Sequence, residues 1–103
     1  MNNIARWTTP AITYKPSAVE IGEIDDIYLV IKQNGQEVLR KGLSDATVST
    51  TTGFTWMFTQ TDTSALSSKA VSVVQIDYTS GVMRYTTMPR QYIITESAIN
   101  EVI

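Results

Sequence analysis

The stretch FTWMFTQTDTSALSSKAVSVVQIDY, residues 54–78, decides the fold of this chain. Its first part, FTWMFTQ, alternates large apolar and polar residues, which is typical of a strand that buries one face. Its middle, TDTSALSS, predicts a short helical turn near residues 61–67 that Thr61 or Thr63 caps. Its last part, AVSVVQIDY, has the β-branched composition of another strand. The stretch therefore predicts a strand, a capped connection and a second strand.

Three aromatic residues share one face of the first of these strands, because successive side chains of a strand point to opposite sides. They are Phe54, Trp56 and Phe58, and we expect them to make the largest single contribution to the core. If Trp56 is buried, the substitution Trp56→Ala costs about 3–5 kcal/mol of unfolding free energy. A loss below about 1 kcal/mol in a denaturation experiment would place Trp56 on the surface instead.

The strand AVSVVQIDY carries apolar residues on both faces. Val71 and Val73 point one way, and Val74, Ile76 and Tyr78 point the other way. Strands that are buried on both sides are rich in such residues. We therefore expect this strand at a central position of its sheet.

A hairpin is the clearest prediction in the first half of the chain. Asn34-Gly35 separates IYLVIKQ from QEVLRKG, and a two-residue type I′ turn needs positive φ at both positions, which Asn and Gly tolerate best. A one-residue bulge would reverse part of the resulting register. The expected cross-strand pairs are Gln33 with Gln36, Lys32 with Glu37, and Ile31 with Val38. The expected core-facing residues are Ile27, Leu29, Ile31 and Val38.

Turn residues divide the rest of the chain. The tripeptide TTG before Phe54 suits a three-residue hairpin loop, with Gly53 in the left-handed position. WTTPAITYKP is bounded by prolines and predicts a short edge strand. Ser80-Gly81 predicts another turn, which an edge strand interrupted at Pro89 follows.

These elements add up to about seven short strands with turns at intervals of roughly 8–12 residues. We therefore expect one all-β domain over residues 1–103, an antiparallel immunoglobulin-like β-sandwich. Residues 95–103 have a weak helical pattern without a cap, and we expect a flexible C-terminal tail there. The chain has no cysteine, so the pattern predicts the sandwich architecture and not the cysteine-bridged immunoglobulin family.

The composition of the chain limits the kinds of partner that we expect. The formal net charge is −2 and the eight basic residues are scattered, so we expect no nucleic-acid partner. The longest wholly apolar run, residues 27–31, is far shorter than the roughly 20 residues that span a bilayer. Residues 1–16 also lack the apolar core of a signal peptide, so we expect no membrane partner and no export. The absence of cysteine is compatible with a reducing cytosol.

The chain has no histidine and no cysteine, so it lacks the catalytic groups that most enzyme classes use. A carboxylate pair of the glycosidase kind remains conceivable, with Asp25-Asp26 as its candidate. Neighbouring residues of a strand point to opposite faces, however, and a small sandwich offers little room for a deep cleft. We therefore expect that the chain is not an enzyme and that it has no catalytic residue and no cofactor.

Four carboxylates precede the strand IYLVIKQ, namely Glu20, Glu23, Asp25 and Asp26. They are a weak calcium candidate, because calcium prefers several oxygen ligands, but they lack the alternating D-x-D-x-D-G spacing of a dedicated loop. The alternative is an acidic surface that keeps an edge strand soluble. An unchanged thermal midpoint in millimolar calcium would remove the calcium hypothesis.

Five aromatic residues form a possible sugar-stacking platform if several are exposed together, although such residues are more often core or interface filler. They are Trp7, Tyr14, Tyr28, Tyr85 and Tyr92. The neighbouring glycines of the first half, Gly22, Gly35 and Gly42, follow no phosphate-binding motif, so we expect no small-molecule ligand.

Six segments of the chain, taken in order, carry a family resemblance: Thr9-Pro10, residues 27–33, residues 58–63, the strand of residues 71–78, Ser80-Gly81 and residues 100–103. With these segments in this order, the chain resembles a group of small prophage-encoded proteins from Gram-positive bacteria. The resemblance spans nearly the whole chain. The acidic pair that follows Thr-Gln in that group is replaced here by Thr61-Asp62, so a partner contact at this turn is not carried over.

Members of that group are similar to the immunoglobulin-like module at the start of phage upper baseplate proteins. The resemblance implies a structural or assembly role in a virion, with other virion or prophage proteins, or further copies of the chain, as partners. It implies a location in the host cytoplasm during assembly and then in the virion. An adhesive or carbohydrate-binding module is the alternative function.

Overall fold

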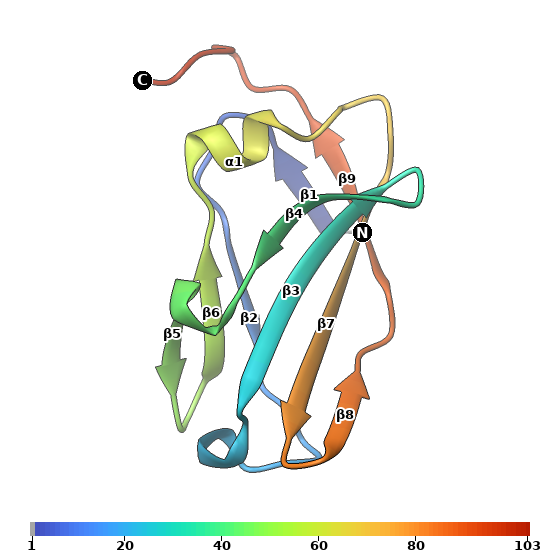
Figure 1. Ribbon diagram of the computed structural model, residues 1–103. Helices are drawn as coiled ribbons and strands as arrows, with labels where there is room; N and C mark the ends of the chain where they lie inside the picture. The colour runs from blue at the N-terminus through green and yellow to red at the C-terminus, as the bar shows by residue number, and fades with distance from the viewer. Residues whose placement is uncertain (1) are drawn as a thin grey trace.

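Two β-sheets packed face to face form the body of the computed structural model, which describes residues 2–103 (Figure 1). The six-stranded sheet has the order β1 (Asn2–Ala5), β9 (Arg90–Thr95), β7 (Ser72–Ser80), β3 (Asp26–Gln33) and β4 (Gln36–Lys41), with β8 (Met83–Thr86) also paired to β7. The three-stranded sheet has the order β2 (Ala11–Tyr14), β6 (Gly53–Met57) and β5 (Ala46–Ser49). Three helical turns connect them: η1 (Ile21–Glu23), η2 (Leu43–Asp45) and α1 (Gln60–Ser64).

The strand order confirms the immunoglobulin-like sandwich. The second, fifth and sixth strands make one sheet, and the third, seventh and ninth lie together in the other. Immunoglobulin domains divide their B, D and E strands from their C, F and G strands in the same way, and β4 occupies the additional place beside C. The short helical turn is also present, and β7 lies between β3 and the β8 and β9 strands, which confirms its central position.

The predicted interruption at Pro89 is confirmed, since residues 87–89 belong to no strand, but the prediction of a single edge strand after Gly81 was wrong. Residues 83–95 form two strands, β8 and β9, and both pair with β7. Thr87 ends β8 because its backbone and its hydroxyl both bond to the backbone of Ile76. In addition β9 is covered on its other side by β1, which the sequence did not predict and which runs parallel to β9.

A bulge shifts the β3–β4 register. Positive φ at Asn34 and Gly35 confirms the predicted turn, and the pairs Lys32 with Glu37 and Gln33 with Gln36 form as expected. The pairing then slips, so that Ile31 lies opposite Leu39 and not opposite Val38. Val38 and Leu39 are both half-buried against the core. The extra residue of the bulge interrupts the alternation of side chains between the two faces of the strand.

The three aromatic residues of the opening stretch lie in the core, as predicted. Phe54, Trp56 and Phe58 are no more than 2% exposed. The indole N–H of Trp56 donates to the carbonyl of Gly42 at 3.0 Å, which satisfies its only polar atom. Opposite them, the six-stranded sheet contributes Ile27, Leu29, Ile31, Val74, Ile76 and Tyr78, all buried.

Side-chain hydrogen bonds hold α1, but the predicted caps were wrong. Thr59 is the N-cap: its hydroxyl accepts from the Asp62 N–H, and the Asp62 carboxylate accepts from the Thr59 N–H, which makes a reciprocal capping box. Thr63 is instead buried, and its hydroxyl bonds to both the N–H and the carbonyl of Thr8. The helical turn is therefore joined to the chain before β2.

The chain after β9 forms neither helix nor strand over residues 96–103 and has isolated bends at residues 98, 99 and 101. The Gln60 amide group holds Ile103 with two hydrogen bonds, one to its N–H at 2.8 Å and one to its carbonyl at 3.0 Å. The predicted flexibility of this tail stays a prediction. No helix within residues 2–103 combines the length and the apolar character needed to cross a membrane.

Candidate functional site

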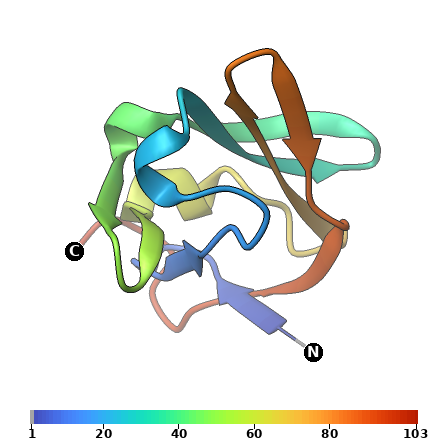
Figure 2. The ribbon, with the colours of Figure 1, turned by 90° about the horizontal axis from the view of Figure 1, so that it is seen from below.

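Three connections meet at one end of the sandwich, which we call the loop end. They are residues 15–25 between β2 and β3, residues 50–52 between β5 and β6, and residues 81–82 between β7 and β8. Figure 2 looks onto this end, with η1 in front of the sheets. Connections that a rigid scaffold positions side by side are common places for binding residues.

The β5–β6 turn is pressed against the start of the β2–β3 connection. Gly53 has a φ of 97°, and a Cβ atom there would collide with the Tyr14 carbonyl oxygen and lie 2.8 Å from the Lys15 Cα. Only glycine fits both the backbone conformation and this contact. The predicted role of Gly53 in the hairpin is thereby confirmed, and the contact fixes the distance between two of the three connections.

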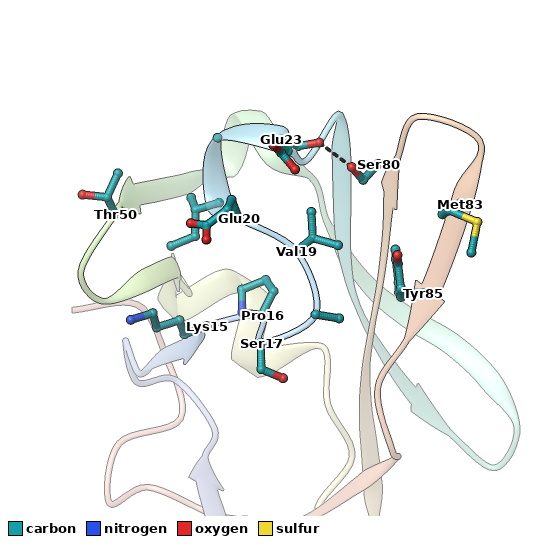
Figure 3. Close-up of a pocket in the computed structure, with 13 residues that line it drawn as sticks. Lys15, Pro16, Ser17, Val19, Glu20, Glu23, Thr50, Ser80, Met83 and Tyr85 are labelled. Carbon is teal, nitrogen blue, oxygen red and sulfur yellow. Dashed lines mark hydrogen bonds between the residues drawn. The ribbon is translucent and has the colours of Figure 1, made fainter.

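A hollow of about 650 Å³ lies at the loop end (Figure 3). Lys15 and Thr50 stand on one side of it, and Met83 and Tyr85 of β8 stand on the other. Residues 16–23 run between them. The walls of the hollow therefore come from three segments that are far apart in the sequence.

Hydrogen bonds tie the β2–β3 connection to the β7–β8 hairpin. The Ser80 hydroxyl donates to the Glu23 carbonyl at 2.8 Å, which Figure 3 marks, and the Gly81 N–H donates to the Asp25 carboxylate at 2.7 Å. The Asp25 N–H donates to the Thr79 carbonyl at 2.9 Å. These three bonds fix the end of the connection, residues 23–25, against the hairpin.

The β7–β8 hairpin gives the loop end an apolar tip. Val82 is fully exposed and Met83 is 54% exposed. Behind them Tyr85 stacks on Tyr78, with 5.0 Å between the ring centroids. Burial, together with the Tyr14 hydroxyl, raises the pKa of Tyr78 to about 12, so this ring supports the tip as a neutral group.

The four carboxylates of the calcium hypothesis do not converge. Glu20 and Glu23 line the hollow, Asp25 accepts from the Gly81 N–H, and Asp26 accepts from the Tyr28 hydroxyl at 2.9 Å. Among residues 2–103, no group of three or more Asp, Glu, His or Cys side chains is arranged to hold a metal ion. The carboxylate pair proposed for catalysis, Asp25 and Asp26, is likewise divided between two separate partners.

The five aromatic residues of the sugar-stacking hypothesis lie on different parts of the molecule. Tyr14, Tyr85 and Tyr92 pack against the core, and Trp7 is half-buried in the connection between β1 and β2. Tyr28 is 38% exposed on the outer face of β3. The structure therefore brings no two or three of them together as an exposed platform.

The sequence predicted an acidic loop before β3 but did not predict the hollow beside it. An apolar pair, Val82-Met83, directly after the turn residue Gly81 was the available signal, because hairpin tips are normally polar. The other residues of the site come together because their connections lie at the same end of the sandwich, which the sheet topology determines.

Comparisons with known proteins add little about function. No protein-family model and no curated protein matches the sequence. A solved structure described as Drosophila OTK, extracellular domains 3-5, matches 90% of this chain and 32% of that chain, with 12% sequence identity and a TM-score of 0.47. The chain thus spans about a third of the length of that structure, and a likeness this weak carries no argument about function.

Proposed function

We propose that this chain is a non-enzymatic phage or prophage structural or assembly protein, a baseplate or tail accessory that binds other virion proteins through its loop end. The observation that carries the proposal is the hollow of about 650 Å³ beside the exposed tip of Val82 and Met83. Exposed apolar side chains at the rim of a rigid hollow are typical of a protein-binding surface.

The resemblance to prophage proteins supports the biological setting. It covers the strands that build the scaffold, residues 27–33 and 71–78, and the capped turn of residues 58–63. These segments form the core and the α1 end, and they support a shared architecture. The partner would differ from one family member to another through the connections, because loops tolerate change better than strands.

A second contact surface is available for further copies of the chain. The edge strand β5 has the sequence ATVS, carries no charge and leaves Val48 half-exposed. The edge strand β4 instead carries Glu37, Arg40 and Lys41, and charged side chains discourage pairing at an edge. Strand addition at an uncharged edge such as β5 would allow self-association.

Affinity capture during phage production tests the proposal. Tagged wild-type protein is expected to retain baseplate or tail proteins, identified by mass spectrometry. The double variant Val82→Asp with Met83→Asp should lose them, because two charges would have to be buried in the contact. Met88→Asp is the matched control, since Met88 is 86% exposed and lies outside the hollow.

Equal capture by both variants would contradict a role for the loop end. An absence of virion proteins from every sample would contradict the assembly role. The alternative function, carbohydrate binding, predicts a signal on a glycan array that Tyr28→Ala or Tyr85→Ala removes.

A further inference from the structure

The outer face of the six-stranded sheet has two adjoining hollows, of about 280 and 240 Å³, over β4, β3, β7 and β8. Val30, Arg40, Asp77 and Arg84 line both of them. Together they form one shallow groove, which we call the arginine groove.

Strand register explains why these side chains meet. Val30 lies opposite Arg40 on β4, Tyr28 lies opposite Asp77 on β7, and Thr79 lies opposite Arg84 on β8. Paired residues of neighbouring strands share a face, and alternate residues of one strand also share a face. One arginine thus borders each side of the two central strands.

The carboxylates of the groove already have hydrogen-bond donors. Glu37 accepts from Arg40 through both of its oxygens, Asp77 accepts from Arg84 and from the Thr86 hydroxyl, and Asp26 accepts from Tyr28. The Thr86 hydrogen bond is the main cause that lowers the pKa of Asp77, and Arg84 and Lys32 lower it further against the effect of burial. Asp77 therefore stays charged and keeps Arg84 in place at neutral pH.

The cations of the groove keep unused donors. Arg40 bonds through Nε and Nη2 and Arg84 through Nη2 alone, which leaves the Nη1 groups of both without a partner among residues 2–103. Lys32 belongs to none of the ion pairs within that range. The guanidinium of Arg40 is also held over the Tyr28 ring, 5.7 Å from its centroid. The free hydrogen-bonding capacity of the groove consists mainly of donors on pre-positioned arginines.

We infer that the arginine groove is a binding site for an acidic ligand with two oxyanion groups, one for Arg40 and one for Arg84. Guanidinium forks match carboxylate and phosphate oxygens in geometry. Lys32, Arg40 and Arg84 are balanced by Asp26, Glu37 and Asp77, so recognition depends on short hydrogen bonds rather than on long-range attraction. This site is separate from the proposed function, which uses the loop end.

Nuclear magnetic resonance titration of the ¹⁵N-labelled protein tests the inference with inorganic pyrophosphate, inorganic phosphate and citrate as probes. Pyrophosphate or citrate should give saturable shifts in β3, β4, β7 and β8, and phosphate should bind at least fivefold more weakly than the better of the two. The preferred probe distinguishes a phosphate ligand from a carboxylate ligand.

Matched variants complete the test. Arg40→Gln and Arg84→Gln should each weaken binding at least fivefold while the thermal midpoint stays near that of wild type, since both side chains are more than half exposed. Arg90→Gln, an exposed arginine outside the groove, should bind as wild type does. No saturable shift, shifts spread equally over Lys15, Lys69 and Arg90, or unchanged binding by both groove variants would overturn the inference.

Discussion

The α1 end and the loop end lie at opposite ends of the sandwich (Figure 1), and their polar groups serve different purposes. At the α1 end, the buried side chains of Gln33 and Thr63 bond to the backbone of distant segments, Gln33 to residues 67 and 70 and Thr63 to Thr8. The half-buried Asp62 caps α1 through Thr59 and forms an ion pair with Lys41. At the loop end, the bonds fix the backbone of the connections, and Val82 and Met83 remain exposed. Polar side chains thus join separate segments at the α1 end, whereas the loop end presents an exposed apolar tip.

This difference separates stability from binding. Polar groups that are buried and paired are costly to disturb, so substitutions at the α1 end should destabilise the domain. Exposed apolar residues stabilise a monomer little, so substitutions at the tip of the loop end should alter contacts and not folding. Four substitutions test this division, from the largest expected effect on stability to the smallest.

Gly53→Ala would disturb the contact between the β5–β6 turn and the β2–β3 connection at the loop end. The added Cβ would meet the backbone of Tyr14 and Lys15 at a positive φ, so we expect a loss of about 3 kcal/mol of unfolding free energy in urea denaturation. Gly22→Ala is the matched control at the same end, because nothing lies within 4 Å of its added Cβ. Equal losses for the two variants would show that close approach at Gly53 is not the cause.

Gln33→Leu would remove the hydrogen bonds that join β3 to residues 67 and 70 at the α1 end. Gln33 is 7% exposed, and its amide bonds to both backbone groups of Ser67 and to the Ala70 carbonyl. Leucine leaves these groups without a partner, at an expected cost of about 2 kcal/mol. Gln36→Leu, on the exposed residue across the hairpin, should change stability by less than about 0.5 kcal/mol. Comparable effects would indicate that water replaces the lost bonds.

Asp62→Asn should cost about 1 kcal/mol at neutral pH. Burial alone would raise the pKa of Asp62, but the hydrogen bonds from Lys41 and Thr59 lower it below the ordinary value of 3.8. The contribution is therefore present above the unfolded-state pKa and is lost as pH falls through the lower folded-state pKa. Denaturation of both proteins should show the difference shrinking below about pH 4.

A double-mutant cycle with Lys41→Met identifies the source of that effect. If the ion pair at 2.7 Å contributes, the two substitutions together cost less than their sum. Strict additivity would assign the whole effect of Asp62 to the capping box.

Val82→Ser should have the smallest effect on stability. Its side chain is fully exposed, so the unfolding free energy should change by less than about 0.5 kcal/mol. Partner capture should nevertheless decrease, because the apolar tip is lost. A large change in stability would contradict the division between the two ends.

Patterns within one segment predicted the local structure well. Phe54, Trp56 and Phe58 follow the period of a strand, and Asn34-Gly35 has the backbone freedom that its turn needs. Capping was harder, because Thr59, Thr61 and Thr63 all carry a suitable hydroxyl. Only the structure shows that Thr59 faces the free N–H groups.

Features that join distant segments were not predictable in this way. The bulge that moves Leu39 opposite Ile31 leaves no mark in the alternation, because Val38 and Leu39 are both apolar. The short strand β1 has no pattern of its own, and its pairing with β9 depends on tertiary contact. The loop end and the arginine groove arise from topology and register, since each combines residues from at least three segments.

The parallel pairing of β1 with β9 has a mechanical consequence. Each residue from Asn2 to Ala5 pairs with one from Tyr92 to Thr95, and the Arg6 N–H extends the ladder to the Thr95 carbonyl. Because the strands run in the same direction, tension applied before β1 and after β9 pulls along the ladder. Its hydrogen bonds would then be loaded together in shear rather than opened one after another. A domain built in this way resists unzipping when its two ends are pulled apart.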